Sequence, residues 1–357
     1  MNTLVLQVGD DPEQDAALVQ AAQILCRGGL VAFPTETVYG LGADATSAQA
    51  IEAVYAAKQR PLGNPLIVHI AAAQELEEVA IPSDSRAGLL AKAFWPGPLT
   101  LVLAAREPVR SALCRGRDTV AVRMPSHPVA LALIRRTGRP LAAPSANLSG
   151  RPSPTTAAHV LQDLQGRIPL ILDGGPCRLG IESTVVDLAQ GPARILRPGI
   201  LTRRMLLEVL DEPLPVSDSE EGASPSPGMR HRHYRPRALL YLIEDGVSDG
   251  ALDRFLDWLG QSGQGNQFGY LGSRPSIRCR PDVTCLPQRH GEAEMARHLY
   301  ADLRELDRRS ADVILADMPL QGGLGRSLRD RLSRASSGIL EQRGGEVRPP
   351  GGFSHQD

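Results

Sequence analysis

Four basic side chains in the N-terminal part of the chain have types and positions suited to binding an anion. Lys58 and Arg60 lie in AKQRPLGNP, Arg123 ends TVAVR, and Arg197 stands in LRPG. An arginine binds carboxylate or phosphate through two parallel hydrogen bonds, whereas a lysine offers a compact charge. Lys58 is the stronger candidate, because only two of the 39 basic residues are lysines. For each arginine, a solvated surface charge is the alternative.

Two polar loops could add hydroxyl and amide groups to such a site. PSANLSGRPSPTT follows an apolar run, and its Ser, Thr and Asn residues either face a ligand or cap a helix. GGPCRLGIESTVVD places Gly180 shortly before Ser183, and glycines allow a ligand to approach the backbone closely. His69, near the end of PLIVHI, is more typical of a histidine in the core or at its rim.

The sequence contains no G-x-x-x-x-G-K-[ST] motif, so a bound nucleotide would be held by arginines and loop amides. The run from Gly322 to Gly325 precedes a predicted helix, as phosphate-binding loops do, but glycines are common before helices without any ligand. We interpret this run as structural. The residues alone therefore predict an α/β protein with an anion-accepting, loop-lined cleft in its first domain.

Alternating helices and short β-branched runs would position these groups, in the pattern of an α/β layer structure. Residues 12–27 have helical apolar spacing, LVAFP is typical of a buried strand, and TETVYGLGADA is predicted to be a loop. Thr46 or Ser47 is expected to cap a helix that ends at Lys58. A further helix is predicted over 128–137. The other predicted strands are PLIVHI, LTLVLA, TVAVRMP, PLAAPS, PLILDG, STVVDL and ARILRPG.

The length of 357 residues favours two domains. We place the first domain at 1–210 and a linker at 211–238, where Pro, Ser and acidic residues dominate. The second α/β domain spans 239–340, with LLYLI and ADVILADM as strands and ALDRFLDWLG and residues 325–337 as helices. The tail, 341–357, is predicted to be disordered.

The composition limits the classes of function. A net charge of −1 and a pI near 6.7 give no electrostatic attraction to a phosphate backbone, so stable nucleic-acid binding is not expected. Five cysteines without a Cys-x-x-Cys pair argue against a zinc site or a disulfide framework and for a reducing compartment. No run of about 18 apolar residues and no leader segment are evident. We expect a cytoplasmic protein without a membrane span.

Seven ordered blocks give the chain a resemblance to a known family. They are FPTETVYGLGADA, KQRPLGNPLIVHI, FWPGPLTLVL, TVAVRMPSHP, APSANLSGRPSPT, GGPCRLGIESTVVD and RPG. Over residues 12–205 the chain resembles the YrdC-like threonylcarbamoyl-AMP synthases, and SPGMRHRHY with the following α/β segment resembles their longer, two-domain form. The resemblance implies an α/β fold with an open, twisted mixed sheet, a positively charged concave face, and a smaller C-terminal α/β Rossmann-like domain.

The resemblance also implies a reaction in which L-threonine, bicarbonate and ATP give threonylcarbamoyl-AMP, pyrophosphate and water. This would be the first step of threonylcarbamoyladenosine formation in tRNA reading codons that begin with A, and a threonylcarbamoyl transferase acting on tRNA would take the product. Mg²⁺ would bridge phosphate oxygens of ATP, with no metal site of the protein's own and no tightly bound cofactor.

The same resemblance assigns site residues. Lys58 and Arg60 are implied to be catalytic, with Lys58 close to the phosphates, and no general base is assigned. Threonine-binding residues are implied at Thr37, His69, Arg123, Ala143 and Ser183. ATP-binding residues are implied at Arg60, Asn64, Thr119, Ser145, Ser153, Arg197 and Tyr234.

Several interpretations remain open on the sequence. SPGMRHRHY, with His233 and Tyr234, is either a lid that closes over a labile adenylate or a passive tether. An RNA-binding or regulatory module with a basic concave face is a different class of function, and the neutral net charge and few aromatic residues weaken it. A carbamoyl-transfer maturation enzyme would carry Cys-x-x-Cys zinc motifs, which the sequence lacks.

Overall fold

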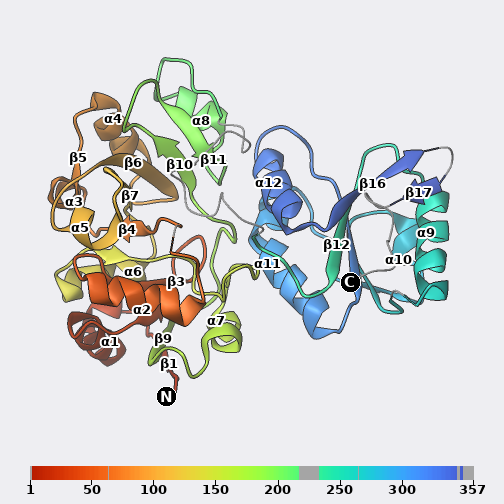
Figure 1. The fold of residues 1–357 in the computed structure, drawn as a ribbon, viewed down its shortest axis with the longest axis horizontal. Coiled ribbons are helices and arrows are strands. Elements are labelled where there is room, and N and C mark those ends of the chain that lie inside the picture. The colour runs from red at the N-terminus through yellow and green to blue at the C-terminus, as the bar shows by residue number, and fades with distance from the viewer. Residues whose placement is uncertain (1, 63, 217–232, 264, 344–345, 349–357) are drawn as a thin grey trace. The chain divides into compact units, whose positions relative to one another are not determined.

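The chain folds into two α/β units, each built on its own sheet (Figure 1). The computed structural model describes residues 2–62, 64–216, 233–263, 265–343 and 346–348. The first unit comprises Met1–Ser149 and Ser153–His231, and the second comprises Gly150–Pro152 and Arg232–Asp357. The predicted fold class, an α/β structure with an open mixed sheet and a smaller C-terminal α/β domain, is confirmed.

The sheet of the first unit is mixed. Its strands are β1 (Leu4–Gln7), β2 (Val31–Phe33), β3 (Gly40–Asp44), β4 (Ile67–His69), β5 (Ala80–Ile81), β6 (Leu99–Ala105), β7 (Thr119–Arg123), β8 (Leu141–Ala142), β9 (Leu170–Asp173), β10 (Thr184–Asp187) and β11 (Arg194–Arg197). They lie in the order β1-β9-β2-β3-β8-β4-β7-β6-β10-β11, and β5 pairs with β6. The central pair, β4 and β7, is parallel, and β8 and β6 flank it in the antiparallel direction.

Helices connect these strands, and their ends follow local capping rules. They are α1 (Ala16–Cys26), α2 (Ala48–Lys58), α3 (Leu76–Val79), α4 (Ser85–Phe94), α5 (Val109–Leu113), α6 (Pro128–Thr137), α7 (Ala157–Leu164) and α8 (Arg203–Leu207), with 3-10 turns at Pro12–Gln14 and Ala73–Glu75. The Ser47 hydroxyl caps α2 by accepting a hydrogen bond from Ala50 N at 3.2 Å. A proline starts α6, and Gly138 ends it in the left-handed conformation. Both helices therefore begin and end as predicted.

The first sheet is buried on both faces. Val31 and Phe33 of β2 belong to one apolar cluster, and Ala32 between them belongs to the other. Because side chains of a strand alternate between faces, the two clusters lie on opposite sides of the sheet. Continuous burial of this kind produces the short β-branched and aliphatic runs that identify the strands in the sequence.

The second unit contains a largely parallel sheet. Its strands are β12 (Leu239–Ile243), β13 (Phe268–Leu271), β14 (Val283–Cys285), β15 (Val313–Asp317), β16 (Gly338–Arg343) and β17 (Glu346–Arg348), and its helices are α9 (Asp249–Gln261), α10 (Pro275–Arg278), α11 (Glu292–Arg308) and α12 (Gly325–Ala335). The order is β14-β13-β15-β12-β16-β17, in which β15 separates β12 from β13. Among the described strands of this unit, only the pairing of β16 with β17 is antiparallel. In the described parts of both units, no helix has the length and apolar character needed to cross a membrane.

One predicted loop is wrong, because TETVYGLGADA contains the strand β3, which pairs with β2 and β8. Because glycines are uncommon in strands, this segment lacks the β-branched pattern that predicts a strand. The packing nevertheless requires these glycines. A Cβ at Gly42 would lie 2.8 Å from Cε1 of Phe33. The absence of a side chain thus allows β3 to pass close to the Phe33 ring.

The predicted domain boundaries also differ from the structure. Leu214, placed in the linker by the sequence, is buried in the core of the first unit, and Pro215 accepts a hydrogen bond from Ile195 N at 2.8 Å. Residues 217–232 lie outside the described part of the chain. The tail prediction for 341–357 is wrong where β16 and β17 form, because backbone pairing with β12 orders a segment without a strong apolar pattern.

Candidate functional site

The sheet of the first unit brings residues implied for substrate binding onto one face. Ile67 and His69 share a face of β4, and Ala121 and Arg123 share a face of β7. The two strands pair with Ile67 beside Ala121 and His69 beside Arg123. Ile67 and Ala121 belong to a small buried cluster, which we call the apolar floor. The apolar floor consists of Ile67, Val102, Ala121, Val185 and Leu196.

Arg123, at the end of β7, is fixed by three neighbours. Its Nη1 donates to Thr37 Oγ1 at 2.9 Å, its Nε donates to the Gly97 carbonyl at 3.3 Å, and its Nη2 lies 2.7 Å from Oε1 of Glu36. Arg123 and Glu36 are 4% and 2% exposed. Burial alone would raise the pKa of Glu36, but the adjacent Arg123 guanidinium outweighs it and lowers that pKa. A guanidinium fixed in this way is suited to binding a carboxylate.

His69 adds a neutral group beside this charge. Its Nδ1 lies 3.2 Å from the carbonyl oxygen of Ile67, and its ring meets that of Phe33 edge-on. Burial, with a further contribution from the Arg123 charge, lowers the pKa of His69 to about 3. The imidazole is therefore neutral near pH 7. With Nδ1–H donating to the carbonyl, Nε2 is an acceptor for a hydroxyl or amine.

Ser183 and Arg197 add further polar groups, at the beginning of β10 and the end of β11. Ser183 Oγ lies 2.7 Å from Thr100 Oγ1. Arg197 donates to the Ser183 carbonyl from Nε at 3.2 Å and from Nη2 at 3.1 Å. A Cβ at Gly199 would lie 2.4 Å from Thr184 N, so the RPG turn needs glycine to bring Arg197 this close. A residue implied for threonine and one implied for ATP are thus in direct contact.

Other residues implied for ATP lie near the opposite ends of β4 and β7. Thr119 begins β7, and the parallel register places it level with Pro65, two residues before Ile67. Arg60 Nη2 donates to the Pro65 carbonyl at 3.3 Å. Thr119 and Arg123 are separated by about 13 Å along an extended strand. Residues implied for threonine and residues implied for ATP therefore lie near opposite ends of the same strands.

Asn64 carries a buried amide that no described residue satisfies. The residue is 1% exposed, and neither Oδ1 nor Nδ2 has a hydrogen-bond partner among the described residues. Its backbone is held firmly, because its carbonyl accepts from the Tyr55 hydroxyl at 2.7 Å. An unpaired buried amide costs about 1–3 kcal/mol, and such groups occur where a ligand supplies the partner. Asn64 is therefore the clearest sign of a ligand at this end.

Lys58 anchors the loop that begins PSAN. Its Nζ donates to the carbonyls of Ser145 and Asn147, the latter at 2.6 Å, and Ser145 Oγ donates to Asn147 Oδ1 at 2.6 Å. Burial first, and the nearby Arg60 charge second, lower the pKa of Lys58 well below its ordinary value. The amino group of Lys58 thus binds two backbone carbonyls and fixes the position of Ser145.

Two other residues implied for substrate binding, Ala143 and Ser153, form hydrogen bonds within the protein. The Ala143 N–H donates to the Ile67 carbonyl at 2.9 Å, so a threonine contact at this backbone would involve the Ala143 carbonyl oxygen. Ser153 is fully buried, and its Oγ donates to Oε1 of Glu182 at 2.6 Å. These contacts fix both segments beside the sheet.

Tyr234 belongs to the second unit. Its ring stacks on that of Tyr300 in α11 with centroids 5.3 Å apart, and it lies 5.8 Å from the ring of His233. The rest of SPGMRHRHY lies outside the described residues, so the lid stays a hypothesis.

Three polar residues that contact implied site residues were not assigned from the sequence: Glu36, Thr100 and Glu182. Glu36 pairs with Arg123, Thr100 with Ser183, and Glu182 with Ser153. The available signal was an acidic or hydroxyl residue inside an otherwise apolar stretch, as in FPTETVYG and GPLTLVL. Such residues become informative only when the fold supplies their partners.

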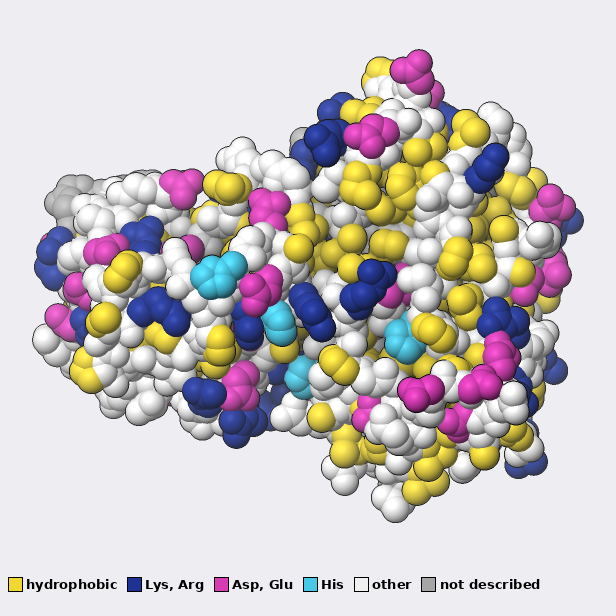
Figure 2. All heavy atoms as spheres, turned by 180° about the vertical axis from the view of Figure 1, so that it is seen from behind, with side chains coloured by type: hydrophobic (Ala, Val, Ile, Leu, Met, Phe, Trp, Pro, Cys, Tyr) yellow, Lys and Arg dark blue, Asp and Glu magenta, His cyan; other side chains and the backbone are white. Residues whose placement is uncertain are grey.

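The surface carries mixed charge on the face shown in Figure 2, where basic and acidic side chains are interspersed and hydrophobic side chains gather over the larger unit. Within the site, Arg123 is likewise balanced by Glu36.

Comparisons with known proteins cover both units. Residues 23–199 match the Sua5–YciO–YrdC family, described as "Telomere recombination", and residues 201–337 match "Threonylcarbamoyl-AMP synthase, C-terminal domain". The threonylcarbamoyl-AMP synthases of Pyrococcus abyssi and Bacillus subtilis are 43% and 42% identical to the chain, covering 94% and 91% of it and 98% and 94% of their own lengths. A crystal structure of P. abyssi Sua5 complexed with L-threonine is similar with a TM-score of 0.84 and 41% identity, over 94% of this chain and 98% of that one.

Proposed function

The chain belongs to the threonylcarbamoyl-AMP synthase family, and on this premise we propose that it joins L-threonine, bicarbonate and ATP into threonylcarbamoyl-AMP, pyrophosphate and water. It is thus an enzyme that transfers an adenylyl group. The product would serve threonylcarbamoyladenosine formation in tRNA. This function is supported over an RNA-binding or regulatory role, because the relatives carry the enzyme's name over nearly their whole length.

The fixed polar groups around Arg123 carry the proposal for threonine. The guanidinium binds the threonine carboxylate, and the apolar floor accepts the methyl group. The hydroxyls of Thr37 and Ser183 and the neutral His69 ring offer partners for the threonine hydroxyl and amine. The threonine complex of the P. abyssi relative supports an amino-acid site on this fold.

The nucleotide would occupy the other group of residues. Arg60, Asn64, Thr119 and Ser145 surround the beginning of β4 and β7, and Arg197 beside Ser183 would meet the phosphates near threonine. We propose Lys58 as a positioning residue, since its amino group holds the Ser145 loop. Ser153 would fix the neighbouring loop. Tyr234 is proposed to contact ATP.

The reaction then needs orientation and charge neutralisation rather than a protein nucleophile. The threonine nitrogen forms a bond to the bicarbonate carbon, and loss of water gives a carbamate. A carbamate oxygen attacks the α-phosphorus of ATP, and the bond to pyrophosphate breaks. Arg60, Arg123 and Arg197 hold the negative groups together, and Asn64 orients the nucleotide.

Mg²⁺ is proposed to enter with ATP, because this ion is usually held through substrate phosphates and water. The amide oxygen of Asn64 and the hydroxyls of Ser145 and Thr119 are oxygen donors of the kind it accepts. Bound there, Mg²⁺ would neutralise phosphate charge. A threonylcarbamoyl transferase is proposed to take the product, and a cytoplasmic location remains a prediction.

The function is tested by pyrophosphate release from the purified full chain with ATP and Mg²⁺. Threonine and bicarbonate are supplied separately and together, and serine replaces threonine in a control. We expect release only when both substrates are present, with serine less effective because it lacks the methyl group. Release that is independent of threonine or bicarbonate would contradict the proposal.

A further inference from the structure

The second unit contains a pocket at the carboxyl ends of its parallel strands. Leu271 ends β13, Leu286 follows β14, and Asp317 ends β15, and all three line the pocket. The chain leaves β13 toward β14 on one side and leaves β15 toward β16 on the other. In open α/β sheets, ligands bind where neighbouring strands lead in opposite directions. The pocket lies at that point of this sheet.

The lining of the pocket is mostly apolar, with a volume of about 180 Å³. Helix α11 contributes Met295 and Leu299, and α12 contributes Leu328 and Leu332. Leu299, Leu328 and Leu332 are buried. Surfaces of this composition exclude water from an apolar or planar ligand.

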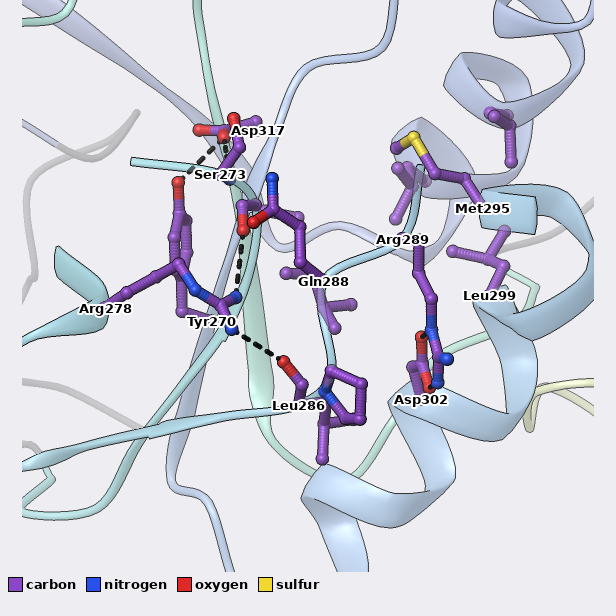
Figure 3. A pocket seen from close by; sticks show the side chains of 16 residues that line it. Tyr270, Ser273, Arg278, Leu286, Gln288, Arg289, Met295, Leu299, Asp302 and Asp317 are labelled. Carbon is purple, nitrogen blue, oxygen red and sulfur yellow. Dashed lines mark hydrogen bonds and ion pairs between the residues drawn. The ribbon is translucent and has the colours of Figure 1, made fainter. Parts of the chain in front are cut away.

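Two arginines give the pocket an excess of hydrogen-bond donors. Arg278 donates to the carbonyls of Gly272 at 3.2 Å and Leu286 at 3.0 Å, while Arg289 uses Nε and Nη2 on Asp302 at 3.0 and 2.7 Å (Figure 3). Nη1 of Arg289 also lies 3.9 Å from Oε1 of Glu294. An arginine carries five N–H donors, so each of the two retains donors for a ligand. The exposed amide of Gln288 adds another donor.

The acidic side chains of the lining are already engaged. Asp317 accepts hydrogen bonds from the Tyr270 hydroxyl at 2.7 Å, from Ser273 N at 3.1 Å and from Arg274 Nε at 3.0 Å. Asp302 accepts both hydrogen bonds of Arg289. The pocket therefore offers N–H donors, while its carboxylates are held by neighbouring donors. This chemistry is complementary to an anion.

The glycine run before α12 does not provide a second anion site. Leu324 N donates to Oε2 of Glu292 at 3.0 Å, so a carboxylate of α11 already binds this helix end. A Cβ at Gly325 would lie 2.6 Å from Oε1 of the same residue. The glycine is needed for this internal contact, which agrees with the structural interpretation of the run.

We propose that the pocket of the second unit binds a nucleoside monophosphate. The phosphate binds Arg278 and Arg289, and the base packs between the apolar side chains of α11 and α12. This site would be separate from the proposed active site and does not depend on the proposed reaction. It would allow the second unit to respond to nucleotide, because α11 carries both Leu299 of the pocket and Tyr300, on which Tyr234 stacks.

The test is photolabelling of the full chain with 8-azido-AMP, followed by peptide mapping. We expect labelled peptides from residues 270–302 or 316–332, and protection by excess AMP but neither by adenosine nor by inorganic phosphate alone. Protection by GMP, CMP or UMP would identify the preferred base. Label confined to the first unit, or absent, would overturn the proposal.

Substitutions of lining residues test whether the labelling takes place in the pocket. Arg289→Lys keeps a charge beside Asp302 but loses the planar pair of donors, and we expect at least a fivefold loss of labelling in the second unit. Gln288→Ala removes an exposed amide with little risk to folding and should reduce labelling about twofold or more. Arg297→Lys, on the exposed side of α11, is the matched control. Equal labelling of all four proteins would contradict the proposal.

Discussion

The candidate site residues differ in how many hydrogen-bond partners the protein gives their side chains. Arg123 has Thr37, Gly97 and Glu36 around its guanidinium, whereas the Asn64 amide lacks a hydrogen-bond partner among the described residues. A ligand that binds Arg123 adds to hydrogen bonds that the guanidinium already makes. A ligand that binds Asn64 instead supplies a hydrogen-bond partner that the amide lacks among the described residues. Substitutions at the two positions should therefore affect stability differently.

Arg123→Lys is expected to weaken threonine binding. The lysine keeps a positive charge for Glu36 but loses the paired donors, and losing a charge-assisted hydrogen bond costs about 1.5–3 kcal/mol, which corresponds to a roughly tenfold to hundredfold higher Kd. Calorimetry with threonine measures this change. Arg135→Lys, an exposed arginine of α6, is the matched control. An unchanged threonine Kd in Arg123→Lys would exclude Arg123 from the site.

Asn64→Leu is expected to separate ligand binding from stability. Removing the unpaired amide should leave the free energy of unfolding unchanged or raise it by about 1–3 kcal/mol. ATP affinity should fall at least tenfold, because the nucleotide loses its partner. Thermal unfolding without ligand and calorimetry with ATP measure the two effects. A less stable variant with unchanged ATP affinity would show that the amide has a structural role.

His69 predicts a pH dependence of stability in the first unit. Its pKa is about 3 in the folded protein, against an ordinary value of 6.5. As the pH falls below 6.5, the unfolded chain therefore takes up a proton that the folded state does not. Stability from this residue is complete above pH 6.5 and is lost between pH 6.5 and about 3. Between pH 7 and pH 5 the loss is roughly 2 kcal/mol.

Urea unfolding at pH 7 and pH 5 tests this effect. In a Trp258→Phe background, Trp95 is the remaining tryptophan and reports on the first unit. His69→Gln should lose about 2 kcal/mol less than its parent when the pH is lowered. His290→Gln, in the second unit, should behave like the parent. Equal pH dependence of all three proteins would mean that His69 is not held neutral by the fold.

At the scale of elements, α2 is joined by hydrogen bonds to the loop that starts at Ser145. Lys58 at the end of α2 binds the carbonyls of Ser145 and Asn147, so the helix positions a loop far away in sequence. The α2 boundaries were predictable because Ser47 is a local cap and the apolar spacing is regular. The target of Lys58 was not predictable, because it depends on strand pairing between distant segments.

Lys58→Met is expected to release this loop. It leaves two carbonyls without their donor, which should reduce the stability of the first unit by about 1–3 kcal/mol. ATP affinity should fall as Ser145 loses its fixed position. Urea unfolding followed by Trp95 fluorescence and ATP calorimetry measure the two effects. The control is Lys92→Met, at the chain's other lysine, which is exposed. It should change neither the stability nor the ATP affinity. Equal behaviour of both variants would contradict the role of Lys58.

Other elements show where sequence patterns are insufficient. The strands β4, β6 and β7 are apolar runs buried on both faces, which is why they were predicted. The strand β3 was missed because Gly40 and Gly42 fit against Phe33 through close packing that the sequence does not reveal. The strand β17 was missed because β16 supplies its order. Backbone pairing with a neighbour can thus outweigh a weak local pattern.

At the scale of the whole molecule, two α/β units and a formal net charge of −1 were predictable from length and composition. The assignment of the site residues required the resemblance, since spacing alone indicated only an anion-accepting cleft. The structure adds how they are arranged, with the groups near Arg123 and those near Asn64 at opposite ends of β4 and β7. The prediction of no stable nucleic-acid binding rests on charge alone.

We propose that this chain assembles threonylcarbamoyl-AMP on the face of β4 and β7. The most direct measurement is mass spectrometry of products formed from ATP, threonine and ¹³C-labelled bicarbonate by the full chain. We expect threonylcarbamoyl-AMP that carries one ¹³C atom, formed in equal amount to pyrophosphate and strongly reduced in Arg123→Lys. A nucleotide product without the label, or labelled product formed equally well by Arg123→Lys, would contradict it.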